Sequence, residues 1–368
     1  SRGDMPQISG QKTYLYSKIR LVMRKSFIII VLLACLIFFA DHSRACTRVV
    51  YQGPDSIIIT ARSMDWKTDI PAALWIFPRG MERDGAAGPN AIKWVSKYGS
   101  VVTSSFGNSS ADGMNEKGLV ANILWLAESE FPAYDVNNKS LSVGAWVQYV
   151  LDNYATVREV VEAFNSGEPV LVSSFIPGTT LMATLHLSVS DARGDNAILE
   201  YIGGKLVVHH HRSYNVMTNS PVFEKQLAIR EYWEQIGGTT FLPGTNRAAD
   251  RFVRAAFYIK AIPQTPDIRT ALAATWSVIR NCSVPFGIAS EKEPNISSTR
   301  WRSVADHKNL VYYFETVTAP NVFMVDMKKI DFNPGAPVLM LNVEDSLTGA
   351  VDASGIFVKA EPFAFAGL

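Results

Sequence analysis

The order of the predicted elements indicates an α+β protein with two stacked antiparallel sheets and helices on their outer faces. Strand-like and helical segments occur in separate runs, without the regular alternation of strand and helix that a parallel sheet needs. Hydrophobic residues make up 48% of the 368 residues and charged residues 19%, as in an ordinary globular protein with ample material for a core. Two stacked sheets with helices outside would use every element.

The first predicted element is a hairpin that pairs residues 46–51 with residues 56–62. Both segments are rich in β-formers, and the sequence Gln-Gly-Pro-Asp between them favours a tight turn. A turn centred in this tetrapeptide sets Cys46 opposite Ala61. Arg62 then lies beside Cys46, and Asp65 lies just beyond the end of the strand.

The remaining elements follow from apolar spacing and from turn residues. A capping box of Thr156 and Glu159 marks the start of a helix that ends at Gly167. Further strands are predicted at 75–78, 92–102, 120–126, 183–190, 197–201, 205–210, 214–218, 301–305, 310–315 and 322–326, with a turn at 112–119. Further helices are predicted at 141–153, 222–235, 248–262 and 267–278.

Residues 1–45 have the pattern of an upstream segment followed by a secretory signal peptide. Basic residues at 18–25 precede an apolar run at 27–40, and Ser43-Arg44-Ala45 supplies small residues at a cleavage site. We therefore expect cleavage after Ala45, which leaves 46–368 as a single exported catalytic domain. The apolar run is too short for a confident membrane span. An alternative is lipidation at Cys35, because Leu-Leu-Ala-Cys resembles a lipidation box.

Cleavage after Ala45 would give Cys46 both a thiol and a free α-amine. The unperturbed pKa of the amine is roughly 7.7–8.0 and that of the thiol about 8.5, so the amine can serve as base for its own thiol. A guanidinium at Arg62 would favour the thiolate, and a carboxylate at Asp65 could orient both groups. These residues predict a self-contained acyl-transfer centre.

Each of these residues also has a simpler interpretation. Arg62 and Asp65 could form a surface ion pair at a strand end. Cys46 could form a disulfide with Cys282, although the apolar helical surroundings of Cys282 favour a small buried hydrophobe. Histidines 209–211 could suggest a metal, but the sequence completes no set of ligands around them, which favours a solvent-facing strand end.

Charge argues against nucleic acid or an anionic membrane as a partner. The first 45 residues hold seven of the 35 basic residues and two of the 34 acidic ones, so 28 basic and 32 acidic residues remain after cleavage. No basic block is left in the exported part.

Several motifs together resemble the choloylglycine hydrolase family, which groups penicillin V acylases with bile salt hydrolases among the N-terminal nucleophile hydrolases. The resemblance runs from Cys46 to about Phe332. Its motifs are Cys-Thr-Arg at 46–48, Arg-Ser-Met-Asp-Trp at 62–66, the turn at 112–119, Asn-Val-Met-Thr-Asn-Ser-Pro at 215–221 and Arg-Phe-Val-Arg at 251–254. Their order and spacing make the resemblance specific.

The resemblance implies a role for each matching position. Cys46 resembles the nucleophile, Asp65 the carboxylate that holds its amine and thiol, and Arg62 the arginine beside the thiolate. Asn219 resembles the side-chain donor to the oxyanion, and Arg251 the second family arginine, with Arg254 as the alternative. The family fold is a four-layer α-β-β-α sandwich, usually assembled as a homotetramer, with no cofactor and no metal.

Trp125 departs from the family pattern. Bile salt hydrolases tend to carry Asn at this position and Gram-positive penicillin V acylases Tyr. Exported acylases of Gram-negative bacteria are similar to this chain in having a tryptophan pair and a signal peptide, and some of them cleave N-acyl-homoserine lactones. Trp66 and Trp125 are therefore expected to bind a phenoxyacetyl group or a fatty acyl tail, unless both are merely part of the core.

The resemblance thus implies a periplasmic or secreted amidase that hydrolyses the side-chain amide of penicillin V, N-acyl-homoserine lactones or both. Its partner would be a small acyl amide, and its mechanism an acyl-enzyme. A conjugated bile salt hydrolase is the first alternative, because it shares the catalytic residues and differs only in the pocket. A non-enzymatic, envelope-associated binding protein is the second, and it would need Cys46 to be blocked.

Overall fold

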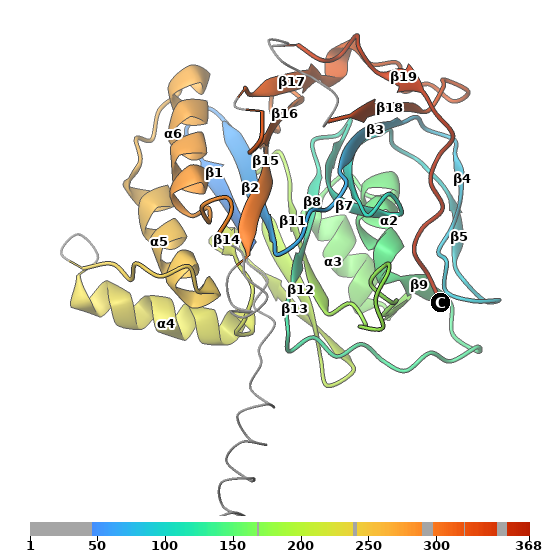
Figure 1. Cartoon of the computed structure of the whole chain (residues 1–368), viewed down its shortest axis with the longest axis horizontal. Helices are drawn as coiled ribbons and strands as arrows, with labels where there is room; N and C mark the ends of the chain where they lie inside the picture. The colour runs from blue at the N-terminus through green and yellow to red at the C-terminus, as the bar shows by residue number, and fades with distance from the viewer. Residues whose placement is uncertain (1–45, 168, 238–240, 289–296, 320, 344–351) are drawn as a thin grey trace, which may run out of the picture. The chain divides into compact units, whose positions relative to one another are not determined.

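Two large antiparallel sheets lie face to face between two groups of helices in the computed structural model (Figure 1). The structure describes residues 46–167, 169–237, 241–288, 297–319, 321–343 and 352–368. The predicted signal peptide, its cleavage site and Cys35 lie outside these ranges. No helix of the described ranges is long and apolar enough to cross a bilayer.

The first sheet contains the N-terminal hairpin and the late strands of the chain. Its order is β14 (Val216–Met217), β1 (Thr47–Gln52), β2 (Ile58–Trp66), β15 (Ser298–Asp306), β16 (Val311–Thr316) and β17 (Phe323–Asp326). Helices α5 (Ala248–Ala261) and α6 (Ile268–Asn281) pack on β1 and β2, and α4 (Phe223–Ile236) packs on α5. Asp267 caps α6 by accepting hydrogen bonds from the backbone N–H groups of Arg269 and Thr270.

The second sheet is built from the middle of the chain. Its order is β13 (Lys205–His210), β12 (Asn196–Ile202), β11 (Leu185–Ser190), β8 (Val120–Trp125), β7 (Ser109–Asn115), β6 (Ser100–Ser105), β3 (Ala73–Phe77), β18 (Leu339–Asn342) and β19 (Val358–Lys359). Helices α2 (Trp146–Asn153) and α3 (Val157–Asn165) cover its outer face. Smaller elements are β4 (Glu82–Asp84), β5 (Lys93–Val95), β9 (Ser140–Ser142), β10 (Val170–Val172), η1 (Val143–Ala145) and η2 (Met327–Lys329).

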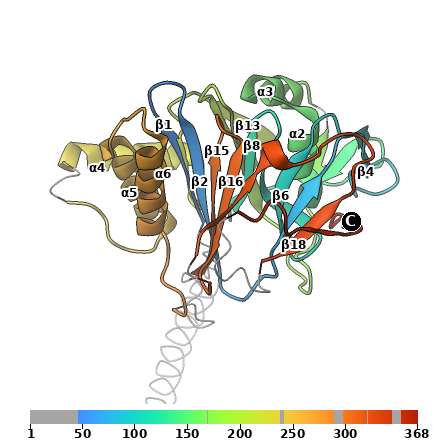
Figure 2. The same ribbon diagram turned by 90° about the horizontal axis from the view of Figure 1, so that it is seen from above.

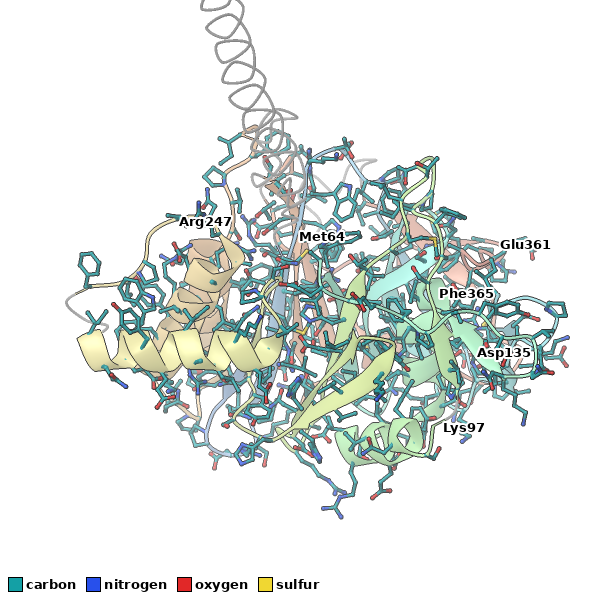
Figure 3. The ribbon with its side chains drawn as sticks, turned by 90° about the horizontal axis from the view of Figure 1, so that it is seen from below. Met64, Lys97, Asp135, Arg247, Glu361 and Phe365 are labelled. Carbon is teal, nitrogen blue, oxygen red and sulfur yellow. The ribbon has the colours of Figure 1, made fainter. Side chains whose placement is uncertain are left out.

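The layers follow the order helix, sheet, sheet, helix, which confirms the predicted α+β sandwich (Figure 2). All nine residues of β2 are buried, because the strand packs against α6 on one side and Arg62 reaches the carbonyl oxygens of Ala111 and Ile123 in the second sheet on the other. Figure 3 shows Met64 of β2 between the helical layer, where Arg247 precedes α5, and the side of the second sheet, where Phe365 lies. A site built on β2 is therefore shielded from water on both faces.

The predicted register of the first hairpin is wrong by three residues. Ala61 pairs with Val49, and the last pair before Cys46 is Thr47 with Ser63. The loop is longer than the predicted tight turn, because Asp55 and Ser56 both adopt left-handed backbone with φ of 53° and 59°. Cys46 consequently lies near Met64 and Asp65 instead of Ala61.

Three further predictions need correction. The segment 92–102 is two strands, β5 and β6, rather than one. Asp112 lies inside strand β7, so the predicted turn at 112–119 is confined to its second half, where Gly118 has φ of 78°. The helix expected at 141–153 begins later, because Leu141 belongs to β9 and η1 precedes α2. Thr156 does cap α3, as its hydroxyl accepts from the N–H of Glu159.

Candidate active site

Cys46 lies at the N-terminal end of β1 and is 2% exposed. Its sulfur is 3.7 Å from Sδ of Met64 and 3.9 Å from the backbone carbonyl oxygen of Asp65. Both neighbours belong to β2, so the three-residue change of register still leaves Cys46 beside the predicted partner strand. Cys46 and Cys282 are free thiols, which excludes a disulfide between them here.

Asn219 and Arg251 hold the backbone of Cys46. The backbone nitrogen of Cys46 donates to Oδ1 of Asn219 at 2.6 Å, and Nη2 of Arg251 donates to the same oxygen at 2.9 Å. Nη1 of Arg251 donates to the carbonyl oxygen of Cys46 and to the hydroxyl of Thr47, both at 2.6 Å. The backbone of Cys46 is thus held on both sides of its Cα atom.

The two arginines of α5 make different contacts. Arg251 is fully buried at Cys46. Arg254 instead donates to the carbonyl oxygens of Pro243 and Thr245 at 2.7 and 2.8 Å. It therefore fastens the loop before α5 and makes no contact of this kind with Cys46.

The Asp65 carboxylate is fully buried behind Cys46. Its Oδ1 accepts from the hydroxyl of Thr299 at 2.5 Å, and its Oδ2 lies 4.0 Å from Nη1 of Arg251. Burial raises the pKa of the Asp65 carboxyl to about 6, although Arg251 and the Thr299 hydroxyl oppose this shift. The group that faces the thiol is the backbone carbonyl of Asp65, while its carboxylate reaches Cys46 through Arg251.

The guanidinium of Arg62 lies between the two sheets, next to Met64. Its Nη1 donates to the carbonyl oxygen of Ala111 at 2.6 Å and its Nη2 to that of Ile123 at 2.7 Å. Nη1 is also 3.5 Å from the buried Asp112 carboxylate, and Nη2 is 3.3 Å from Sδ of Met64. Arg62 therefore joins β2 to the second sheet.

The surroundings of the Cys46 thiol favour its protonated form. Burial raises the pKa of this thiol, and the positive charges of Arg62 and Arg251 offset the effect only in part, while Asp65 adds to it. A buried thiol with a raised pKa is mostly protonated near neutrality. A neighbouring amine on the same residue could remove that proton.

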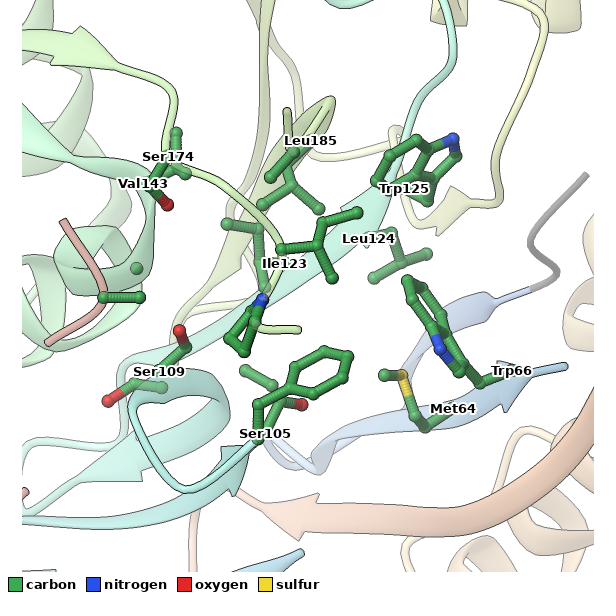
Figure 4. A pocket seen from close by; sticks show the side chains of 18 of the residues that line it. Met64, Trp66, Ser105, Ser109, Ile123, Leu124, Trp125, Val143, Ser174 and Leu185 are labelled. Carbon is green, nitrogen blue, oxygen red and sulfur yellow. The ribbon is translucent and has the colours of Figure 1, made fainter. Parts of the chain in front are cut away.

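Trp66 and Trp125 line an apolar pocket whose lining also includes Cys46. Figure 4 shows the two indoles in this pocket. Both side chains are 7% exposed, and their ring centroids are 6.2 Å apart at an angle of 76°. Phe106 extends the aromatic wall, 5.9 Å from Trp66. The empty space among the lining residues is about 660 Å³ when the open solvent in front of the pocket is included.

One hydrogen bond joins Asn219, which holds the backbone of Cys46, to Trp125, which lines the pocket. Nδ2 of Asn219 donates to the carbonyl oxygen of Trp125 at 2.7 Å. An amide NH₂ group has a second hydrogen, so Asn219 keeps one donor for another acceptor. Trp125 thus contributes its ring to the pocket and its backbone to the placement of Asn219.

Sequence reasoning missed two residues that support the site. Thr299, on β15, holds the Asp65 carboxylate, and its position 234 residues along the chain gave no local signal. Gln226, on α4, donates to the carbonyl oxygens of Asn219 and Pro221. The prediction of a helix just after the 215–221 motif could have pointed to Gln226, which lies one turn inside α4.

The histidine run does not form a metal site in the described part of the chain, which contains no cluster of three ligating side chains. His209 contacts Glu200, His210 contacts Asp195, and His211 contacts Ser213. Cys282, at the end of α6, is buried as expected, with its sulfur 4.0 Å from the carbonyl oxygen of Arg251.

A family model and two known proteins match this chain over most of its length. The family model of linear amide C–N hydrolases, choloylglycine hydrolase family, matches residues 46–345. A penicillin V acylase from Pectobacterium atrosepticum is 50% identical over 94% of this chain and 98% of its own. A bile salt hydrolase/transferase from Clostridium perfringens is 26% identical over 77% of this chain and 93% of its own.

Solved structures show the same fold. The structure of a penicillin V acylase from Agrobacterium tumefaciens matches with a TM-score of 0.81 and 54% identity, over 88% of this chain and all of the other. A conjugated bile acid hydrolase from Clostridium perfringens matches with a TM-score of 0.68 at 20% identity, over 87% of this chain and 98% of the other.

Proposed function

The chain belongs to the choloylglycine hydrolase family of linear amide C–N hydrolases, and we propose that it removes the acyl group from penicillin V and from N-acyl-homoserine lactones. The observation that supports this proposal is the apolar pocket of Trp66 and Trp125 beside the sulfur of Cys46. Two indole faces suit a phenoxyacetyl ring or an alkyl chain. They suit the broad, hydroxylated face of a sterol less well.

The proposed reaction uses Cys46 as the nucleophile and its own amine as the base. The amine takes the thiol proton as sulfur attacks the amide carbonyl, which gives a tetrahedral oxyanion. Collapse breaks the C–N bond while the amine returns the proton to the leaving nitrogen. Water then attacks the thioester, with the same amine as base, and releases the carboxylic acid and the thiol.

The contacts around Cys46 fit these steps. The second hydrogen of Asn219 Nδ2 would donate to the oxyanion, together with a backbone N–H. Arg251 would keep the amine in place through Asn219 and through the Cys46 carbonyl, with Asp65 balancing its charge. Arg62 would favour the thiolate as it forms.

We test the substrate by measuring release of primary amine from three amides side by side. They are penicillin V, a long-chain N-acyl-homoserine lactone at mildly acidic to neutral pH, and a glycine-conjugated bile salt. Turnover of either of the first two with the bile salt inert supports the proposal. A dominant rate with the bile salt would instead favour the bile salt hydrolase reading.

Export and assembly are parts of the same proposal. We propose that the signal peptide is removed after Ala45 and that the mature enzyme acts in the periplasm as a homotetramer. Intact-mass measurement should give a chain that begins at unmodified Cys46, whereas a start at acylated Cys35 would contradict it. Light scattering of the purified protein should give four times the chain mass, and a monomer mass would contradict the assembly.

A further inference from the structure

The segment after the matched family region returns to the second sheet. Residues 352–368 follow the match at 46–345. The ring of Phe363 lies 5.1 Å from that of Trp75 and 5.7 Å from that of Phe77, and the ring of Phe365 lies 6.3 Å from that of Trp94. Two aromatic anchors therefore fix this tail on residues of β3 and β5.

The next residue, Ala366, is held by hydrogen bonds on both sides. Its backbone nitrogen donates to the carbonyl oxygen of Asn108 at 2.7 Å, and its carbonyl oxygen accepts from the hydroxyl of Ser142 at 2.5 Å. Ala366 is also one of the residues that line the pocket of Trp66 and Trp125. The tail thus contributes a fixed wall to the candidate acyl site.

This wall lies at the end of the pocket away from the nucleophile. Figure 4 shows Met64, the neighbour of Cys46, at one end, and Ser109 and Val143 at the other. Ala366 belongs to the second group, because a Cβ atom on Gly144 would lie 2.7 Å from the Ala366 carbonyl oxygen and 3.1 Å from Oγ of Ser109. Gly144 has no side chain, which allows this close approach.

We propose that Ala366 is a specificity-determining residue that limits the length of the acyl group. The inference rests on the proposed acylase function and adds a size limit to it. An acyl chain attached to Cys46 would pass the two indoles and extend toward the end that Ala366 lines. A longer side chain at this position would take up space beside Gly144 and Ser109, which also line the pocket.

The inference predicts that kcat/KM rises with the length of the acyl chain only up to a limit, which we call the break. Burial of each additional methylene should raise kcat/KM about fourfold until the chain meets the far wall, where the increase stops. Ala366→Leu adds three carbon atoms to the wall. We expect the break to move to acyl chains shorter by two or three carbons.

The experiment measures kcat/KM for straight-chain N-acyl-homoserine lactones from butanoyl to dodecanoyl with the whole enzyme. Ala364→Leu is the matched control, because Ala364 is an exposed residue of the same tail that does not line the pocket. It should leave the break where the wild type has it. Ala366→Val is a milder second variant, with an expected shift of about one carbon, and thermal unfolding checks that each variant is folded.

The outcomes separate the inference from the function on which it rests. A shorter limit in Ala366→Leu and Ala366→Val, but not in Ala364→Leu, supports the inference. An unchanged break in both Ala366 variants overturns it while the acylase function stands. A wild-type enzyme that cleaves none of the series, yet turns over penicillin V, also overturns the length limit. Inactivity on every acyl amide overturns the proposed function itself.

Discussion

Two sides of Cys46 differ in how they are built. On one side, Asn219, Arg251 and Asp65 are buried, and hydrogen bonds and an ion pair join them to one another and to the backbone of Cys46. On the other side, the pocket is lined by rings and aliphatic groups such as Trp66 and Trp125. Hydrogen bonds demand particular atoms at particular distances, whereas apolar contacts tolerate changes of shape. The polar side therefore fixes the chemistry, and the apolar side can vary with the substrate.

The largest effect should come from Cys46→Ala. Loss of the nucleophile should lower kcat by about a millionfold, as loss of the nucleophile does in a serine protease. The side chain is small and its backbone bonds to Asn219 and Arg251 remain, so the melting temperature should stay within a few degrees. Residual turnover above one part in a thousand would show that Cys46 is not the nucleophile.

A smaller loss should follow from blocking the α-amine. A chain that keeps one extra residue ahead of Cys46 retains the thiol but has an amide where the base should be. We expect kcat to fall by about 10²–10⁴, the usual contribution of a general base. Wild-type rates in this chain, verified by mass spectrometry, would rule out the amine as base.

Asn219→Ala removes the side chain that contacts Cys46, Arg251 and Trp125. If Asn219 donates to the oxyanion, kcat should fall by about 10²–10³ while KM changes little. Asn215→Ala is the matched control on the same segment, because its side chain makes only a 3.4 Å contact with the Val50 carbonyl oxygen. Equal losses in both variants would indicate a general disturbance of this segment.

Asp65→Asn should change the pH dependence of stability. The pKa of Asp65 is raised to about 6 by burial, so the folded state favours the protonated carboxyl. The stability from this preference is present below about pH 4 and is lost as the pH rises through 6. Between pH 4 and 7 the wild type should lose about 3 kcal/mol relative to Asp65→Asn, measured by denaturant unfolding. Parallel curves for the two proteins would contradict the raised pKa.

The smallest effect should come from the apolar side. Trp125→Tyr keeps an aromatic ring but shortens its contact with Trp66, and kcat/KM for penicillin V should fall about three- to tenfold. Trp276→Tyr is the control, since Trp276 is equally buried but lies on α6, outside the pocket. A loss of kcat/KM above a hundredfold would indicate that Trp125 acts chiefly by positioning Asn219, through the hydrogen bond to its backbone carbonyl.

Features that depend on local sequence could be predicted, and features that depend on contacts between distant residues could not. The fold class and the helices near 157–165, 223–236, 248–261 and 268–281 follow from local periodicity and capping residues such as Thr156, and the structure bears them out, whereas the start of the helix predicted at 141–153 was wrong. The hairpin register does not follow from them, because two left-handed residues, Asp55 and Ser56, lengthen the loop without a glycine at either position. The contact of Cys46 with β2 survived this error, since the whole strand runs beside it.

Contacts between residues far apart in the sequence were the main feature that the sequence analysis did not predict. The support of Asp65 by Thr299 and the contact of Ala366 with Ser142 beside the pocket join residues more than two hundred positions apart in the sequence. No local pattern marks such a pair. The different contacts of Arg251 and Arg254 could not be predicted either, because both lie within one turn of α5 and only the packing of that helix on β1 brings Arg251 to Cys46.

The burial of Cys282 has a practical consequence for counting functional molecules. Its thiol is fully enclosed, and burial raises its pKa to about 11, so it presents almost no thiolate to a reagent in water. An acyl-like electrophile that enters the pocket should therefore label the folded, processed enzyme once per chain, at Cys46. The stoichiometry of that label would give the concentration of competent enzyme directly, so that rates from different preparations could be compared on one scale.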